Sequence, residues 1–126
     1  MTDIVIDLDA LVQQVRAVAR ETPEFVYQSA GYEDDGGPTC RYVRDGRPSC
    51  IIGHAAARAG VALAVLEDWD SRPVGCDIAT VLEDLYGLAG DACGWLDEVQ
   101  RHQDYGGQWG AAVERADAVL RGRVVS

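Results

Sequence analysis

The stretch CRYVRDGRPSCIIGH, residues 40–54, contains two cysteines and a histidine, and its pattern favours a change from a small sheet to a helix. Asp45-Gly46 suits a two-residue hairpin turn of type I′, which needs positive φ at both central residues. Pro48 cannot donate a ladder hydrogen bond, so the strands on either side of the turn should be short. We therefore expect an edge-like hairpin, followed by a helix that Ser49 caps.

Apolar residues recur at helical spacing on both sides of this stretch. Asp7 can cap the first helix, and Asp77 can cap a later one that Gly87 would close. The expected helices cover residues 8–21, 49–60, 61–69, 77–86, 91–105 and 109–120. The third of them is either a separate helix or the continuation of the second.

Residues 24–27, EFVY, have the aromatic and β-branched content of a short strand. Together with the hairpin, this strand would place one small antiparallel sheet within residues 24–51. The sequence thus predicts a helix-rich α+β fold with about five helices and this sheet. Residues 1–126 show no internal repeat and no linker, which indicates a single domain.

The chain is acidic, with 21 acidic and 11 basic side chains and a formal net charge of −10. Direct binding to nucleic acid is disfavoured, because that affinity comes mainly from Lys and Arg that replace condensed counterions. An acidic protein can instead imitate nucleic acid and occupy the site of an enzyme that acts on nucleic acid. No apolar run approaches the roughly 20 residues that span a bilayer, and the N-terminal MTDIVIDLDA lacks the features of a secretory signal. We expect a cytoplasmic protein without membrane insertion.

Cys40, Cys50 and His54 form the first candidate site, since Cys and neutral His are natural zinc ligands and the hairpin could bring the two cysteines together. A fourth ligand could be an acidic side chain, Cys76, Cys93 or His102. The spacing C-x9-C-x3-H lacks the C-x2-C knuckle that is typical of zinc ribbons. Structural zinc is therefore a minor hypothesis, and no other cofactor is expected.

Cys50 is also a candidate nucleophile, because the start of a helix favours the thiolate form of a cysteine. His54 on the same helix face, or His102 from a distant helix, would be the base of a cysteine-dependent hydrolase. In the alternative interpretation these side chains only pack, since free cysteine is among the most buried residue types and Gly53 permits close packing. The packing interpretation is favoured, and we assign no catalytic or metal-binding residue.

A second passage, residues 95–113, has two tryptophan-bearing helices that meet at a glycine-rich turn. Tryptophan combines a large apolar area with a polar N–H, which is favoured at protein interfaces. The candidate binding residues of this passage are Trp95, Gln103, Asp104, Tyr105 and Trp109. In the alternative interpretation the two tryptophans anchor the core of a helical hairpin.

The two passages together contain the patterns C-x-Y…D-G-x-P-x-C-I-x-G-H and W-L-x-x-V-Q-x-x-Q-D-x-G-x-x-W. With these patterns the chain resembles small uncharacterised proteins of actinobacteria and their bacteriophages. The resemblance implies an origin and no catalytic residues. Because many small phage proteins bind and redirect a host protein, it favours a non-enzymatic interaction module that modulates a host protein. The alternatives are the cysteine hydrolase and the nucleic-acid mimic, and a homodimer is as compatible with the pattern as a monomer.

Overall fold

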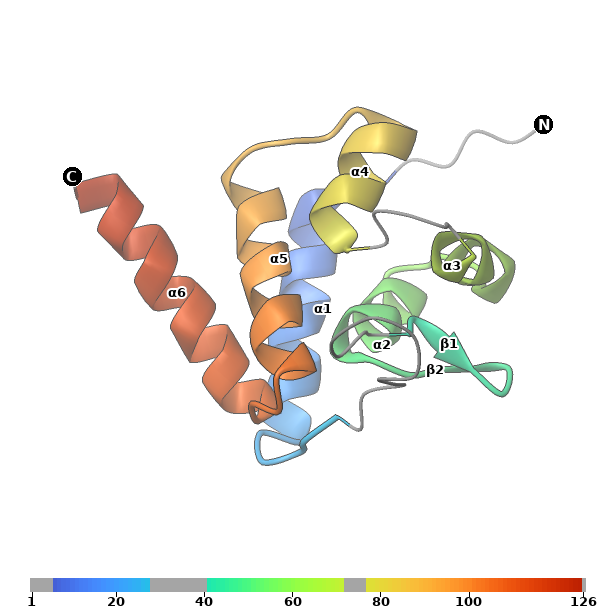
Figure 1. Ribbon diagram of the computed structural model, residues 1–126, viewed down its shortest axis with the longest axis horizontal. Coiled ribbons are helices and arrows are strands. Elements are labelled where there is room, and N and C mark those ends of the chain that lie inside the picture. Colours follow the sequence, from blue (N-terminus) through green and yellow to red (C-terminus); the bar gives the residue numbers. More distant parts are fainter. Residues whose placement is uncertain (1–5, 28–40, 72–76, 126) are drawn as a thin grey trace.

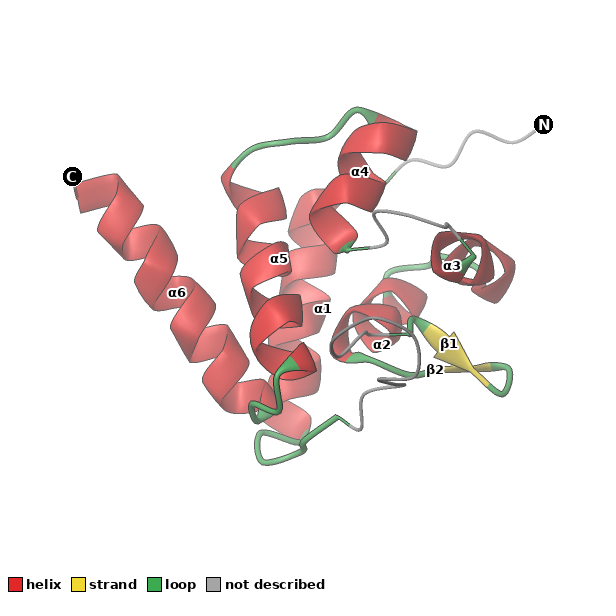
Figure 2. Cartoon of the chain, viewed as in Figure 1, coloured by secondary structure: helices red, strands yellow, loops and turns green. Residues whose placement is uncertain are grey.

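Six helices and one two-stranded sheet form the part of the chain that the computed structural model describes, residues 6–27, 41–71 and 77–125 (Figure 2). In chain order these elements are α1 (Leu8–Glu21), β1 (Val43–Arg44), β2 (Arg47–Pro48), α2 (Ile51–Arg58), α3 (Leu63–Asp70), α4 (Ile78–Tyr86), α5 (Asp91–Asp104) and α6 (Trp109–Val125). The predicted helix-rich α+β class is confirmed. No helix in these ranges is long and apolar enough to cross a membrane.

Helix α5 contacts four other helices, α1, α2, α4 and α6, whereas α3 lies beside the β1–β2 hairpin at the other side of the molecule (Figure 1). The buried face of α5 includes Trp95, Leu96 and Val99, which join Val15 of α1 and Leu82 of α4 in one core. Burial of a large apolar side chain contributes roughly 1.5–3 kcal/mol relative to leaving it exposed. The core is therefore built around α5.

The predicted ends of α1 and α4 are confirmed. The Asp7 side chain caps α1 and accepts a hydrogen bond from the Ala10 N–H at 3.1 Å. Asp77 caps α4 in the same way through the Thr80 N–H at 3.3 Å. Gly87 ends α4 in the left-handed conformation, which glycine adopts without steric penalty. Each of these caps depends on residues that are close together in the sequence.

The hairpin turn also forms as predicted. Asp45 and Gly46 have φ angles of 56° and 74°, both positive as a type I′ turn requires. Within the described residues the sheet consists of β1 and β2 alone and does not include residues 24–27, so this part of it is smaller than predicted. Pro48 has no N–H to donate, and the chain turns into α2 three residues later.

The residue that caps α2 is Cys50 and not Ser49, which corrects the prediction. The Ser49 N–H donates to the carbonyl oxygen of Tyr42 at 2.9 Å and so continues the hairpin by one residue. Its hydroxyl is hydrogen-bonded to the Tyr27 hydroxyl at 3.2 Å. Since Ser49 is held by the hairpin, the helix begins one residue later, where the Cys50 sulfur accepts the Gly53 N–H.

Residues 24–27 do not form the predicted strand, and the segment makes one isolated bridge to the residue before α6. The carbonyl oxygens of Pro23 and Phe25 instead accept hydrogen bonds from the N–H groups of Gly110 and Trp109, at 2.9 and 3.0 Å. The first N–H groups of a helix have no partner within the helix. This segment therefore supplies acceptors to the start of α6 in place of a sheet neighbour.

The described part of the chain forms six helices rather than about five, because α2 and α3 are separate helices. Gly60 follows α2 with a φ of 101°, a left-handed conformation that ends helices. The Val61 N–H then donates back to the Ala56 carbonyl oxygen at 2.9 Å, which closes the last turn of α2. The sequence did not decide whether α2 and α3 are separate, and the structure places the break between them at Gly60.

Candidate functional site

The Cys50 thiol is fully buried at the start of α2, and its Sγ accepts a hydrogen bond from the Gly53 N–H at 3.4 Å. His54, one turn later, is partly buried, with its ring centroid 5.7 Å from that of Trp109 in an edge-on arrangement. Burial, and to a smaller extent the charge of Arg58, lowers the pKa of His54. This part of the opening stretch is a packed junction between hairpin and helix, and its thiol has no access to solvent in the folded protein.

The predicted zinc site falls partly outside the described residues, because Cys40 and the alternative ligand Cys76 both lie beyond them. Cys93 is buried on α5, where burial and then the charge of Glu83 raise the pKa of its thiol. Within residues 6–27, 41–71 and 77–125, no three His, Cys, Asp or Glu side chains could together hold a metal ion. Zinc binding that involves Cys40 stays a prediction.

Gln103 is fully buried and connects three helices. Its Oε1 accepts hydrogen bonds from the Ile51 N–H at 2.9 Å and from the Trp109 indole N–H at 3.2 Å. Its Nε2 donates to Asp104 Oδ1 at 2.7 Å. A side chain of α5 thus caps the start of α2 and holds the first residue of α6. Gln103 and Trp109, both predicted as binding residues, lie inside the protein.

Gln100 makes a similar connection one turn earlier in α5. Its Oε1 accepts the N–H of Ile78, the first residue of α4, at 2.7 Å, and its Nε2 donates to the Tyr42 hydroxyl at 3.0 Å. Like Gln103, it is almost completely buried. Two amide side chains of α5 therefore supply acceptors to the starts of two other helices.

Trp95, another predicted binding residue, is also buried. Its indole N–H donates to Asp117 Oδ1 at 2.9 Å. Both Asp117 oxygens accept hydrogen bonds from Arg16, at 2.8 and 3.0 Å, and the Arg16 guanidinium lies 4.8 Å from the centroid of the Trp95 ring. These contacts join α1, α5 and α6. They agree with the interpretation of the tryptophans as core anchors of a helical hairpin.

Asp104, at the end of α5, is only partly exposed and has an altered proton affinity. Burial raises the pKa of Asp104 to about 7. The hydrogen bond from Gln103 opposes this rise in the pKa, and the charge of Asp97 adds to it. The carboxyl group therefore gains or loses its proton near neutral pH, beside the buried amide that caps α2.

This shift in the Asp104 pKa predicts that the protein is more stable in mild acid than in mild base. The folded protein holds the proton more tightly than the unfolded chain, so the free energy of unfolding falls as the pH rises from about 4 to about 7 and is constant above that range. We expect a decrease of about 1–2 kcal/mol between pH 5 and pH 8. This is less than the roughly 2.7 kcal/mol that about two pH units of different proton binding would give in this window, because water partly screens the group.

Urea unfolding of the wild type and of Asp104→Asn at the two pH values measures this effect. The variant should lose most of the difference, since the asparagine oxygen can still accept the Gln103 hydrogen bond but does not ionise. Asp9→Asn, at an exposed position of α1, is the matched control and should keep the difference. The same pH dependence in all three proteins would contradict the assignment to Asp104.

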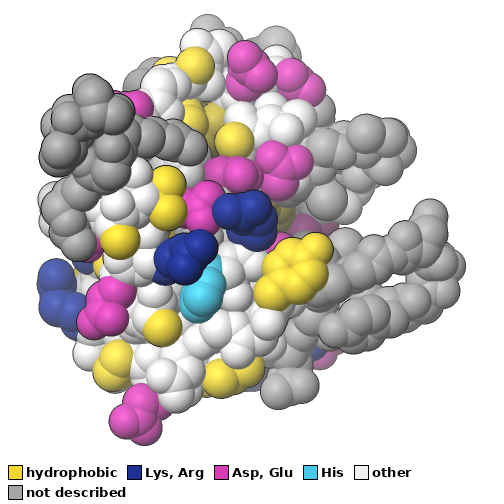
Figure 3. Space-filling view, turned by 60° about the vertical axis from the view of Figure 1, so that its left-hand side comes forward, with side chains coloured by type: hydrophobic (Ala, Val, Ile, Leu, Met, Phe, Trp, Pro, Cys, Tyr) yellow, Lys and Arg dark blue, Asp and Glu magenta, His cyan; other side chains and the backbone are white. Residues whose placement is uncertain are grey.

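The end of α5 and the facing side of α6 form an exposed pocket of about 410 Å³, which we call the Tyr105 pocket. It is lined by Glu98, Arg101, His102, Tyr105 and Arg115. Tyr105 is 74% exposed, more than any other large hydrophobic side chain in the described ranges. Figure 3 shows a face of the molecule on which basic and acidic side chains, a histidine and a large hydrophobic side chain lie together. The pocket has two arginines and one glutamate among its lining residues, on a chain whose net charge is −10.

Contacts within the Tyr105 pocket position these side chains. Arg101 donates through Nη2 to both carboxylate oxygens of Glu98, each at 2.8 Å. The His102 ring lies against Gly107 so closely that a Cβ atom there would overlap the ring. Arg115 forms no ion pair with any carboxylate of the described residues. The pocket therefore presents, close to an exposed tyrosine ring, a guanidinium that has no ion-pair partner in the described part of the chain.

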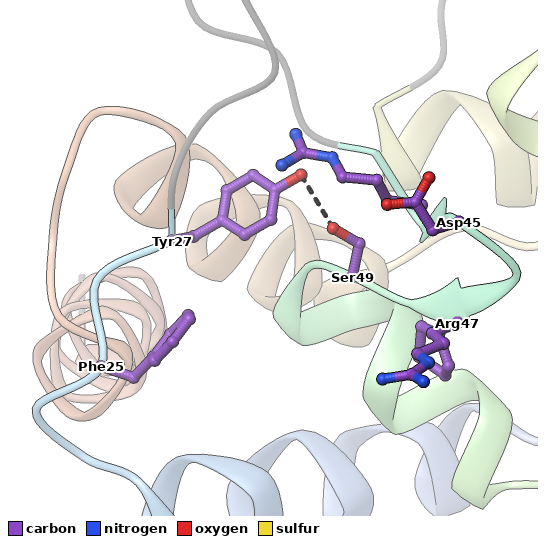
Figure 4. Close-up of a pocket in the computed structure, with 7 residues that line it drawn as sticks. Phe25, Tyr27, Asp45, Arg47 and Ser49 are labelled. Atoms are coloured by element: carbon purple, nitrogen blue, oxygen red, sulfur yellow. Dashed lines mark hydrogen bonds between the residues drawn. The ribbon is translucent and has the colours of Figure 1, made fainter.

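A second pocket, of about 570 Å³, lies between the hairpin and the segment that follows α1 (Figure 4). This hairpin pocket is lined by Phe25, Tyr27, Arg44, Asp45, Arg47, Pro48 and Ser49. Figure 4 shows Tyr27 pointing from one side toward Ser49, with which it is hydrogen-bonded. Phe25 packs on Trp109, with ring centroids 4.5 Å apart. The two aromatic side chains of the hairpin pocket thus already contact other residues of the chain.

Of the five predicted binding residues, Tyr105 alone lines either of these two pockets. Arg101 and Arg115 are absent from the prediction, and His102 enters it only as a base or a metal ligand. The sequence does contain a signal for the α5 side of the pocket, because positions 98, 101, 102 and 105 follow the spacing i, i+3, i+4, i+7 of one helix face. No such signal exists for Arg115, which comes from a different helix.

No protein-family model, curated protein or solved structure matches this chain. The candidate sites therefore depend on the chemistry and geometry of the residues themselves. The resemblance to actinobacterial and phage proteins stays a prediction.

Proposed function

We propose that this chain is a small acidic interaction module, encoded by an actinobacterium or its phage, that binds and modulates a host protein in the cytoplasm. The observation that supports this most is the Tyr105 pocket, in which a 74% exposed tyrosine lies beside Arg101, His102 and Arg115. Tyrosine and arginine are enriched among the residues that contribute most to protein–protein binding. The partner would bind at the corner between α5 and α6.

The fold supports such a surface by holding α5 firmly. Gln100 and Gln103, on the buried side of this helix, are hydrogen-bonded to the starts of α4 and α2. A surface that is already ordered loses little conformational entropy when it binds. Covering the Tyr105 ring would then add apolar burial, which contributes roughly 25 cal/mol for each Å² removed from water.

Affinity capture from an actinobacterial lysate tests the proposal with three immobilised proteins: the wild type, Arg115→Glu and Arg47→Glu. Arg47 is the matched control, since it is also an exposed arginine but lines the hairpin pocket. We expect the wild type and Arg47→Glu to capture the same host protein, and Arg115→Glu to capture at least tenfold less. Equal capture by all three would exclude the Tyr105 pocket. Loss in Arg47→Glu alone would move the binding surface to the hairpin pocket.

The same capture experiment distinguishes the interaction module from the two alternative functions. A cysteine hydrolase would need Cys50, whereas the interaction module should capture its partner unchanged in Cys50→Ser, because a serine oxygen can still accept the Gly53 N–H that the thiol accepts. A nucleic-acid mimic needs a continuous acidic surface, whereas acidic and basic side chains are interspersed on the face in Figure 3. Mimicry also predicts capture of a nucleic-acid enzyme that weakens steeply with salt.

A further inference from the structure

The side chains of the Tyr105 pocket combine cationic donors with an apolar wall. We infer that this pocket binds the C-terminal carboxylate of the partner protein, with an apolar last side chain of that protein against the Tyr105 ring. The inference rests on the proposed function, because it identifies the part of the partner that the pocket binds.

Two guanidinium groups in the pocket have donors to offer. Arg115 has no carboxylate partner among the described residues. Arg101 uses only Nη2 in its bonds to Glu98, so Nη1 and Nε make no hydrogen bond within the described ranges. Arginine and carboxylate groups form charge-assisted hydrogen bonds, which are roughly twice as strong as neutral ones and are frequently paired. A carboxylate is therefore the group that these donors match best.

The size of the pocket suits the end of a chain. Its volume of about 410 Å³ is in the lower part of the range for small-ligand sites, roughly 300–1,000 Å³. One or two residues of a peptide fit such a space, whereas a longer segment would extend beyond it. Tyr105 forms an apolar wall close to the arginines. A carboxylate and an apolar side chain on the same residue occur together at the C-terminus of a protein.

The negative charges of the chain and of the pocket favour a ligand with a single negative group. The chain has a net charge of −10, and Glu98 lines the pocket itself, where it is held by Arg101. A phosphate group or an acidic segment would bring about two or more negative charges toward this carboxylate, whereas a chain end brings one. Capture of a C-terminal carboxylate is a recurring mode of peptide recognition. The C-terminus of a protein is therefore favoured over both other anions.

Fluorescence polarisation with short peptides and the whole chain tests the inference. Labelled hexapeptides that end in Leu, Val, Ile or Phe are compared with the same peptides as C-terminal amides, and inorganic phosphate is added as a competitor. We expect at least one free-acid peptide to bind tenfold or more tightly than its amide, and millimolar phosphate to leave it bound. Equal affinity of acid and amide, no binding by any peptide, or displacement by phosphate would each overturn the inference.

Three variants locate the binding site. Arg115→Glu should lower the affinity for the free-acid peptide at least tenfold. Arg47→Glu, in the hairpin pocket, should leave that affinity unchanged. Tyr105→Ala should reduce the preference for an apolar last residue but keep the difference between acid and amide. Circular dichroism and urea midpoints should show all three variants folded, since these side chains are exposed. If the folded Arg115→Glu variant bound the free-acid peptide with wild-type affinity, the peptide carboxylate would have to bind outside the Tyr105 pocket.

The inference and the proposed function can fail separately. Suppose that Arg115→Glu loses the captured host protein while no peptide binds. The partner would then dock through a folded surface, so the C-terminal inference would be wrong and the proposed function would stand. If capture is also independent of Arg115, both are wrong. If peptides bind as expected but no captured protein depends on Arg115, the carboxylate pocket stands and the proposed function loses its main support.

Discussion

Replacing Gly53 with alanine is expected to lower the free energy of unfolding by about 3 kcal/mol. A Cβ atom at this position of α2 would overlap the carbonyl oxygen of Tyr42 and would lie 3.0 Å from its carbonyl carbon. Within a helix, alanine is normally more favourable than glycine by roughly 0.8–1 kcal/mol. A loss of stability at Gly53 would therefore report the contact between α2 and the hairpin.

The backbone of Tyr42 is held in place on several sides, so the overlap cannot be relieved cheaply. Its carbonyl oxygen accepts the Ser49 N–H at 2.9 Å, and its own N–H donates to Asp70 Oδ1 at 2.8 Å. Its side chain is fully buried, with the ring centroid 5.4 Å from that of Trp69. Moving the carbonyl away from α2 would disturb these contacts together.

Urea unfolding followed by tryptophan fluorescence measures the loss, with Gly46→Ala as the control. A Cβ atom at Gly46 would meet nothing within 4 Å, but φ there is 74°, so alanine should cost about 1–2 kcal/mol through backbone conformation alone. A cost at Gly53 that is no larger than the cost at Gly46 would show that the hairpin can move away from α2.

The parts of the fold that the sequence predicts are those set by neighbouring residues. Asp7 and Asp77 cap helices through N–H groups three residues later, and Asp45-Gly46 specifies its own turn. The spacing of apolar residues also predicts the helices, because an amphipathic helix must place its apolar side chains on one face. The helical class of the fold could therefore be predicted without any knowledge of tertiary contacts.

The features that could not be predicted depend on residues far apart in the sequence. Gln103 and Ile51 are separated by 52 positions, and Gln100 and Ile78 by 22, yet each pair forms a buried hydrogen bond. In the sequence a glutamine beside Asp104 suggests a polar surface, and only the packing of the helices shows that it is internal. For the same reason three of the five predicted binding residues, Trp95, Gln103 and Trp109, are buried, Asp104 is only partly exposed, and Tyr105 alone is well exposed.

Replacing Gln103 with leucine is expected to have the largest effect of any single substitution considered, a loss of about 3–5 kcal/mol. Leucine fills a similar space but leaves the Ile51 N–H and the Trp109 indole N–H without the acceptor that they share. Each unsatisfied buried donor costs roughly 1–3 kcal/mol. Urea unfolding measures the loss, and Gln13→Leu, at an exposed position of α1, should change stability by less than about 0.5 kcal/mol.

A second substitution at the same position distinguishes the contribution of the Gln103 hydrogen bonds to stability from the contribution of its packing. Gln103→Glu keeps oxygen acceptors for both donors but replaces Nε2, which donates to Asp104, with a second oxygen. At pH 5 the two carboxyl groups can share a proton, whereas at pH 8 both tend to ionise and repel each other. We therefore expect Gln103→Glu to be more stable than Gln103→Leu at pH 5 and to lose that advantage toward pH 8. If the two variants are equally stable at pH 5, the shared acceptor is not what Gln103 contributes, and its role is to fill space between α2, α5 and α6.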